Sequence, residues 1–218
     1  MKLCTLALIA SAVFGGIAQA QLVSLDFDAA VGSPALASQF NTGRYSFHNA
    51  VFLPKLDRFG DPIPGTEHWQ VDVAADLSTP ITIENPSLEE WGRGHAPSEP
   101  FALQAVFGPV LIQFDQAYRL SQFSVFLDHD AFGTDGANIE FLSGTTIAHQ
   151  IGLDQTVPGF RATLDFAENI TGIVLPSGAF YDDLSFRMTA VPEPSTWAAG
   201  CALAVIAATV VIRRRRAV

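Results

Sequence analysis

Apolar and polar side chains alternate with a period of two in several segments between residues 21 and 190. The apolar positions are Val23, Leu25 and Phe27; Val110, Ile112 and Phe114; Phe123, Val125 and Leu127; Ile139 and Phe141; Ala162, Leu164 and Phe166; and Leu184, Phe186 and Met188. Successive side chains of a strand point to opposite faces of a sheet. The alternation therefore predicts half-buried antiparallel strands with these apolar residues facing the core.

Turn signals separate the alternating segments. They are Gly32-Ser33-Pro34, Gly60-Asp61-Pro62, Asp135-Gly136, Ser143-Gly144 and Val157-Pro158-Gly159. No helical periodicity longer than two turns occurs before residue 197. Many short strands joined by turns, with no helices between them, are typical of two packed sheets. The sequence therefore predicts an all-β fold, an antiparallel two-sheet sandwich.

The N-terminal segment has the pattern of a secretory signal peptide. Lys2 precedes an apolar run from Leu3 to Ile17, which is followed by Ala18, Gln19 and Ala20. A positive start, an apolar stretch and a small-x-small site together predict cleavage after Ala20. The alternative is an N-terminal membrane anchor, for which the apolar run is short against a span of about 20 residues. We expect residues 1–20 to be removed.

The C-terminal segment has the pattern of a membrane span. Residues 197–212 carry no charge, and Arg213, Arg214, Arg215 and Arg216 follow them. A helix over 197–212 would cover roughly 24 Å at 1.5 Å per residue, which suffices to cross if the arginines snorkel. Because a cluster of arginines stays in the cytoplasm, residues 21–190 are expected to face the outside.

The residues before this span add a specific motif. Pro192-Glu193-Pro194, the apolar helix and the terminal arginines together resemble the PEP-CTERM sorting signal of exported bacterial proteins, here residues 191–218. The resemblance implies recognition by a membrane-embedded exosortase after signal peptidase has acted, and cleavage near the motif. It also implies an envelope rich in exopolysaccharide. The alternative is an ordinary single-pass anchor with a proline-containing stalk.

The exported domain, residues 21–190, is strongly acidic. The whole chain has a net charge of −10. The domain holds seven Lys and Arg against 21 Asp and Glu, so its own net charge is −14. Such a surface repels phosphate backbones, and we expect no nucleic-acid partner. Cys4 and Cys201 lie outside the domain, which therefore has neither a disulfide nor a thiolate ligand.

A second resemblance concerns the domain itself. The segments that carry it are Leu25-Asp26-Phe27-Asp28, Gly32-Ser33-Pro34, Gln39-Phe40, Tyr45-Ser46-Phe47 and Phe180-Tyr181-Asp182-Asp183-Leu184-Ser185-Phe186. They are similar to exported jelly-roll domains of the carbohydrate-binding-module type. The resemblance implies a jelly roll for residues 21–190. Residues 54–100 match nothing in it, and we expect an insertion or a loop-rich face there.

Two acidic groups are candidate calcium sites. The first is the cluster of Asp128, His129, Asp130, Gly133, Asp135, Gly136, Asn138 and Glu140. Its Asp-x-Asp start suits calcium, but the later positions depart from an EF-hand loop, and a solvated turn is favoured. The second is Asp26, Asp28, Asp182 and Asp183, which meet if the first and last strands are neighbours. A structural calcium there is implied only by the habit of jelly-roll binding modules, and a polar exposed face is favoured.

A candidate sugar-binding stretch contains Glu89, Glu90 and Trp91, and Trp69 is the other aromatic candidate. Aromatic faces pack on pyranose rings, but covering the edge of the core is the favoured role for both tryptophans. Adjacent residues of a strand point to opposite faces, so Glu89 and Glu90 alone cannot flank a glycosidic bond.

Motifs for catalysis are missing from the sequence. It contains no Gly-x-Ser-x-Gly elbow, no His-Glu-x-x-His helix and no Walker loop. The histidines, at positions 48, 68, 95, 129 and 149, lack metal-like spacing. We therefore expect a non-enzymatic protein of the cell surface or extracellular matrix, whose domain binds or structures exopolysaccharide. The alternative is a secreted glycan-active hydrolase.

Overall fold

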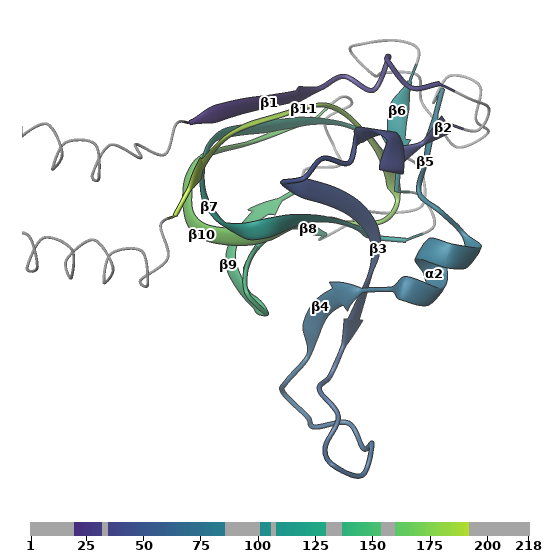
Figure 1. Ribbon diagram of the computed structural model, residues 1–218, viewed down its shortest axis with the longest axis vertical. Coiled ribbons are helices and arrows are strands. Elements are labelled where there is room, and N and C mark those ends of the chain that lie inside the picture. Colours follow the sequence, from purple (N-terminus) through teal and green to yellow (C-terminus); the bar gives the residue numbers. More distant parts are fainter. Residues whose placement is uncertain are drawn as a thin grey trace, which may run out of the picture. The chain divides into compact units, whose positions relative to one another are not determined.

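The computed structural model of the protein describes residues 20–31, 35–85, 101–105, 108–129, 137–153 and 160–191. Its elements are β1 (Gln21–Leu25), β2 (Ala35–Leu36), the 3-10 helix η1 (Ala37–Phe40), β3 (Tyr45–Leu53), β4 (His68–Val71), α2 (Val73–Ser78), β5 (Thr82–Glu84), β6 (Ala102–Gln104), β7 (Val110–His129), β8 (Asn138–Ser143), β9 (Thr146–Gly152), β10 (Phe160–Leu175) and β11 (Ala179–Ala190). Residues Gln21–Thr189 form one compact unit. The predicted antiparallel all-β fold is confirmed (Figure 1).

Long strands connect the two halves of the sheet. The strand order is β2-β5-β6-β11-β7-β10-β8-β9, with β1 beside β11 and β3 beside β7 and β4. The start of β7 pairs with β3 and with the end of β10, whereas the rest of β7 pairs with the start of β10. The sheet bends back on itself along these strands (Figure 1).

The prediction of separate strands at 110–114 and 123–127 was wrong. Both segments belong to β7, a single strand of 20 residues. The stretch between them contains no glycine or proline, and Tyr118 and Leu120 within it are buried. Because no glycine or proline interrupts the strand, the chain bends within β7 and does not form a turn between two strands.

The bend changes which side chains face the core. Leu164 pairs with Phe123 and Ala167 pairs with Leu120, so two outward residues separate the inward ones on each strand. Gln122 lies at this point with a φ of 55°, an uncommon conformation for a residue other than glycine. The alternation of inward and outward side chains therefore changes phase in both strands at the same place. This change of phase keeps the apolar residues of each strand in the core.

Strict alternation predicts Phe166 as a core residue, and this prediction was wrong. Its side chain is 48% exposed, and the Arg119 guanidinium lies 5.5 Å from the centre of its ring. The remaining predicted core positions are buried, except Leu25 and Leu164, which are partly exposed. The periodicity therefore predicted the core correctly wherever the strands are regular.

Aromatic side chains fill the core between the two halves of the sheet. Phe123 of β7 meets Phe141 of β8 edge to face, with ring centroids 4.9 Å apart. Phe186 of β11 contacts Tyr45 of β3 at 6.3 Å and Phe114 of β7 at 5.8 Å. Edge-to-face pairs add to the free energy that ring burial itself provides.

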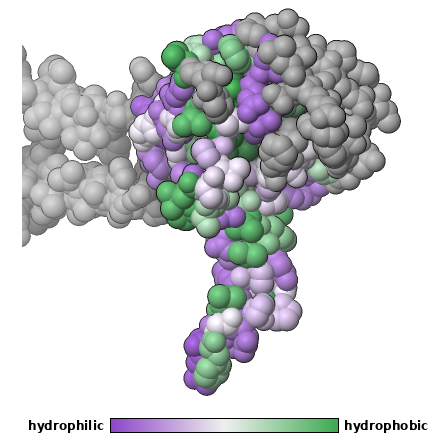
Figure 2. Space-filling model, turned by 90° about the vertical axis from the view of Figure 1, so that its right-hand side faces the viewer, coloured by the Kyte–Doolittle hydropathy of each residue, from purple (hydrophilic) through white to green (hydrophobic). Residues whose placement is uncertain are grey.

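Residues 54–85 contribute an arm, the helix α2 and the short strand β5 to this scaffold. The arm consists of the paired ends of β3 and β4 and the loop between them, residues 54–67, which carries Leu56 and Phe59 on its surface. Asp57 shapes the tip, since its Oδ1 accepts hydrogen bonds from the backbone N–H groups of Phe59 and Asp61. The arm projects from the body and shows both apolar and polar side chains (Figure 2).

One prediction about stability concerns Tyr181 of β11. Its ring is fully buried, and its hydroxyl donates a hydrogen bond of 2.7 Å to the carbonyl of Pro176. Burial raises the pKa of the Tyr181 phenol well above its ordinary value of 10.0. Above that pH an unfolded tyrosine loses its proton while folded Tyr181 keeps it, so stability falls as pH rises.

We expect Tyr181→Phe to weaken this alkaline loss of stability, because phenylalanine has no proton to lose. Urea unfolding between pH 8 and pH 11 measures it. The variant also lacks the hydrogen bond to Pro176, which lowers its free energy of unfolding by about 1 kcal/mol at every pH. Only the slope of this free energy against pH is therefore compared between the two proteins. Parallel slopes for the two proteins would contradict the assignment.

Candidate functional site

The outer face of β3 carries polar side chains. Tyr45 and Phe47 are buried in the core, so the alternate residues Ser46 and His48 point away from it. Ser46 pairs across the sheet with Gln113 of β7, whose side chain is exposed. Directly opposed residues of antiparallel strands share a face, so these side chains are neighbours.

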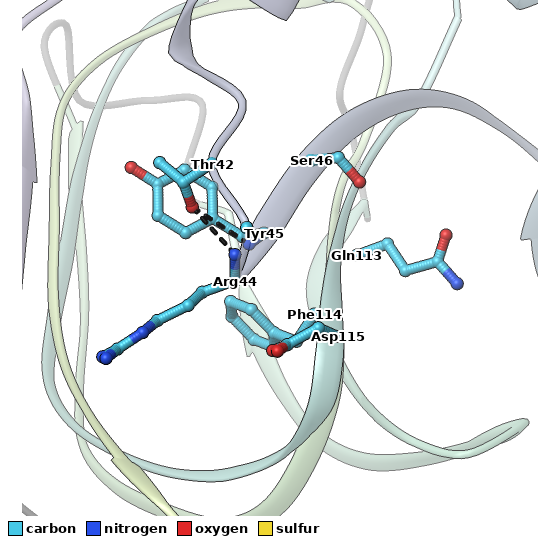
Figure 3. A pocket seen from close by; sticks show the side chains of 8 residues that line it. Thr42, Arg44, Tyr45, Ser46, Gln113, Phe114 and Asp115 are labelled. Carbon is cyan, nitrogen blue, oxygen red and sulfur yellow. Dashed lines mark hydrogen bonds between the residues drawn. The ribbon is translucent and has the colours of Figure 1, made fainter.

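Two recesses border this face. The first has a volume of about 270 Å³ and is lined by Thr42, Gly43, Arg44, Tyr45, Ser46, Gln113, Phe114 and Asp115 (Figure 3). The second, about 350 Å³, is lined by His68, Trp69, Gln70, Val71, Leu111, Gln113, Phe114, Leu142, Gly144, Thr145, Thr171 and Gly172. Because they share Gln113 and Phe114, we treat them as one outer-face groove, defined by these residues.

Trp69 of β4 forms one wall of the groove. It is partly buried and packs with Val71 against an outer cluster of Ala50, Leu111, Leu142 and Val174. The Trp69 indole N–H donates a hydrogen bond to Glu140, whose other oxygen accepts one of 2.7 Å from Gln150. Trp69 therefore covers part of the core, as favoured from sequence, and also lines a recess.

The floor of the second recess is built from β10 and the β8–β9 turn. The Thr171 hydroxyl accepts a hydrogen bond of 2.9 Å from the Gly144 N–H and donates one of 3.2 Å to the Leu142 carbonyl. A Cβ at Gly172 would lie 3.2 Å from the carbonyl oxygen of Ile112. The lack of a side chain at Gly172 therefore leaves space at the floor of the second recess. Polar groups around this floor come from Gln70, Gln113 and Thr145.

The first recess is shaped by the turn before β3. The Thr42 hydroxyl oxygen accepts hydrogen bonds from the backbone N–H groups of Arg44, at 3.1 Å, and Tyr45, at 3.2 Å. The Arg44 guanidinium donates to the side chain of Gln21 in β1. Burial raises the pKa of the Tyr45 phenol above its ordinary value of 10.0.

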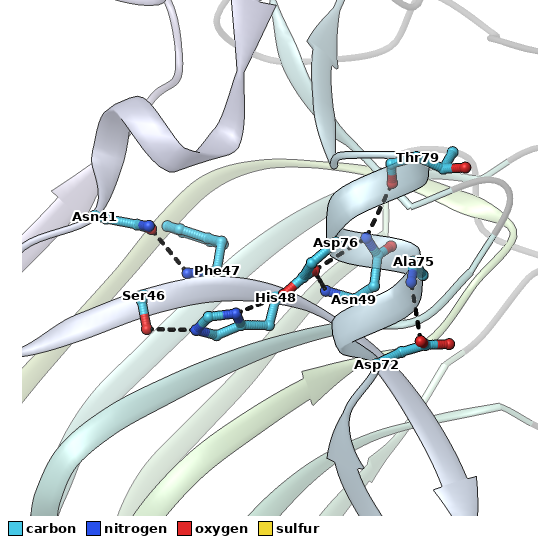
Figure 4. Close-up of polar contacts among 9 residues, drawn as sticks. All are labelled: Asn41, Ser46, Phe47, His48, Asn49, Asp72, Ala75, Asp76 and Thr79. Atoms are coloured by element: carbon cyan, nitrogen blue, oxygen red, sulfur yellow. Dashed lines mark hydrogen bonds and ion pairs between the residues drawn. The ribbon is translucent and has the colours of Figure 1, made fainter.

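A chain of hydrogen bonds runs from this recess to α2 (Figure 4). Ser46 Oγ lies 2.8 Å from His48 Nε2, and His48 Nδ1 lies 2.8 Å from Asp76 Oδ2. Asp76 comes from α2, whose first turn is capped by the Asp72 carboxylate accepting from the Ala75 N–H at 2.9 Å. Sequence reasoning missed this group. A Ser-x-His pair on one strand face was its only signal, because Asp76 is distant in sequence.

The first and last strands are neighbours, since Leu25 of β1 pairs with Leu184 of β11, so the condition for the second acidic group to meet is fulfilled. The acids at these ends have protein partners. Asp183 forms an ion pair of 3.0 Å with Arg161, and Asp182 Oδ1 accepts a hydrogen bond of 2.7 Å from the Asp183 N–H. Asp28 accepts one of 3.3 Å from the Phe101 N–H. Within the described ranges, no three His, Cys, Asp or Glu residues are grouped to hold a metal ion.

The other candidate calcium cluster lies largely outside the described residues. The described members Asn138 and Glu140 lie in β8 rather than in a loop. The backbone of Asp128 and His129 ends β7. The side chains of those two, and all of Asp130, Gly133, Asp135 and Gly136, are outside what the structure describes.

Several further predictions also fall outside the described residues. They concern Ala18, Glu89, Glu90, Trp91, Pro192, Glu193, Pro194, the 197–212 helix, and Arg213, Arg214, Arg215 and Arg216. Of the expected signal peptide only Ala20 is described, and it is exposed. In the part of the chain that the structure covers, no helix has the length and apolar character that a membrane crossing requires.

Comparison with known proteins identifies no relative of this chain. No family model, no curated protein and no solved structure matches the chain. The outer-face groove and the Ser46–His48–Asp76 group are therefore interpreted from their own geometry.

Proposed function

We propose that the protein is an exported protein of the cell surface or extracellular matrix whose domain binds exopolysaccharide. The observation that supports binding is the outer-face groove, in which one tryptophan stands among amide and hydroxyl side chains. Sugars present both an apolar ring face and many hydroxyl groups. A site with an aromatic wall and polar groups placed around it suits both features.

The details of the fold support the same proposal. Under this proposal, the bent antiparallel sheet is a jelly-roll-like sandwich. The two halves of the sheet form the two layers of the sandwich. The adjacency of β1 and β11 and the aromatic core between the halves favour this description. Carbohydrate-binding modules commonly use such sandwiches, which makes the proposal consistent with the sequence resemblance.

The groove also has a rigid base, which favours ligand binding. Trp69 is fixed by the outer cluster beneath it, by its hydrogen bond to Glu140 and by the Phe52 ring, whose centroid lies 5.0 Å away. A side chain that is already ordered loses little conformational entropy when a ligand packs on it.

Retention on a gel of the native exopolysaccharide tests the binding proposal. The full chain is applied in detergent, and we expect it to be retained and then released by the soluble glycan. Passage of the folded chain through every matrix glycan gel without delay would contradict the proposal.

Export and sorting are proposed from the two ends of the chain. We expect protein recovered from its native cell surface and medium to lack residues 1–20 and the segment from Trp197 to Val218. Intact mass measures this directly. A variant with alanines at Pro192, Glu193 and Pro194 should lose the signal peptide but keep the tail, because the exosortase would no longer recognise it.

The alternative for the tail predicts a different mass. Native protein that retains Trp197 to Val218 is a stable single-pass anchor, and this result would remove the exosortase from the proposal. The glycan proposal would stand, because an anchored domain reaches the same matrix.

A further inference from the structure

The hydrogen-bonded group of Ser46, His48 and Asp76 has the arrangement of a nucleophile, a base and an orienting carboxylate. The two contacts, Ser46 Oγ to His48 Nε2 and His48 Nδ1 to Asp76 Oδ2, are both 2.8 Å (Figure 4). Activated serines in hydrolases depend on such a chain, and they are identified by geometry rather than by sequence order.

The carboxylate of Asp76 is held in place from its other side. Its Oδ1 accepts hydrogen bonds from the Asn49 backbone N–H at 2.6 Å and from the Asn49 side-chain amide at 3.1 Å. The same amide donates to the Thr79 carbonyl at 3.0 Å. Oδ2 is thereby aimed at His48, which places the imidazole proton on Nδ1 and leaves Nε2 free to accept from Ser46.

Ser46 also has access to a ligand. Its side chain lines the first recess of the outer-face groove, and Figure 3 shows the Ser46 hydroxyl and the Gln113 amide on the same side of the β3–β7 pair. An amide N–H beside a serine nucleophile suits the oxygen that becomes negative when an ester carbonyl is attacked.

We propose that Ser46 is the nucleophile of an esterase site that removes short acyl groups from hydroxyl groups of a glycan. The first recess, with a volume of about 270 Å³, fits a short acyl chain better than a polymer. The polymer would lie in the adjoining second recess. The choice of a glycan as the alcohol rests on the proposed function, whereas the role of Ser46 does not.

The reaction balances with water as the second reactant. Ser46 Oγ bonds to the acyl carbon as its proton moves to His48 Nε2, and the ester C–O bond breaks with that proton passing to the leaving sugar oxygen. Water then attacks the acyl-serine, His48 takes its proton, and the proton returns to Ser46 Oγ as the carboxylic acid leaves. Asp76 is a positioning residue that stabilises the protonated imidazole.

The first arm of the test uses a fluorophosphonate probe on the full chain and does not involve glycan. We expect one probe per chain, mapped to Ser46 by peptide mass, and none on Ser46→Ala. His48→Gln should slow labelling at least about 100-fold, the usual contribution of a general base. Asp76→Asn should slow it less, and Ser143→Ala, which changes a partly exposed serine at the end of β8, should label at the parent rate.

The outcomes of this arm are decisive because folding is checked for each variant by circular dichroism. A folded parent chain that takes no probe overturns the proposal, and so does labelling that His48→Gln leaves unchanged. Ser46→Ala removes one atom at a partly exposed position, so it tests the assignment even if His48→Gln fails to fold.

The second arm separates this inference from the proposed function. The full chain is given p-nitrophenyl acetate and, separately, O-acetylated exopolysaccharide, and release of nitrophenol or acetate is followed. Turnover of both that is lost in Ser46→Ala supports the whole proposal. Turnover of the small ester alone overturns the glycan as substrate while leaving the nucleophile in place.

Discussion

Replacing Phe186 with alanine should lower the free energy of unfolding by about 3 to 5 kcal/mol, the cost of a cavity where a buried aromatic ring stood. Phe186 is fully buried in β11, and its ring contacts Tyr45 and Phe114 from the strands that form the opposite side of the core. Unfolding in urea, followed by circular dichroism of the full chain in detergent, measures the change.

Phe166→Ala is the matched control, since the same substitution is made in β10 at a side chain that is 48% exposed. Half of this side chain is already exposed, so the substitution creates no enclosed cavity, and with the loss of the Arg119 contact we expect a decrease of about 1 kcal/mol or less. Equal losses for the two variants would show that Phe166 is a core residue and that the change of phase in β7 and β10 is wrong.

Replacing Trp69 with alanine should weaken binding of exopolysaccharide about 30-fold. An aromatic side chain that anchors a ligand is commonly worth about 2 kcal/mol, which corresponds to that change in dissociation constant. Equilibrium titration with oligosaccharides prepared from the exopolysaccharide measures it. Phe59→Ala, at the exposed tip of the arm and outside the groove, should bind as the parent chain does.

Trp69 also packs on the outer cluster, so its loss can disturb the groove indirectly. Gln113→Ala provides a second variant, because this side chain is exposed and borders both recesses. We expect it to weaken binding by about 1 kcal/mol, the typical worth of one hydrogen bond. Unchanged affinity in both folded variants would place any glycan site elsewhere.

Periodicity was sufficient to predict the fold class and most of the core. Positions such as Ile112, Phe141 and Phe186 follow strict alternation in regular strands, and all three are buried. Phe166 was assigned wrongly because a bend that shifts two strands together leaves no glycine or proline in the sequence to mark it. Because both strands change phase together, the pairing register stays continuous there, and the change is visible only in which side chains are buried and in the positive φ of Gln122.

The candidate site was predicted less well, for reasons that concern distance along the chain. Trp69 was identified as a sugar-binding candidate, but its neighbours in the groove, Gln113 and Thr171, come from strands far away in sequence. Asp76 reaches His48 only because α2 packs beside β3. Such groupings depend on the topology, which residue types and spacing along one chain do not specify.

The central claim is that the outer-face groove binds exopolysaccharide, and the indole resonance of Trp69 tests it most directly. In a ¹H–¹⁵N spectrum of the full chain in detergent this resonance is identified by its absence from Trp69→Ala. We predict that it shifts progressively and reaches a limit as exopolysaccharide oligosaccharide is added, because the ligand packs against the indole ring. A Trp69 resonance that stays in place at saturating glycan, or a shift confined to the Trp91 indole, would contradict the claim.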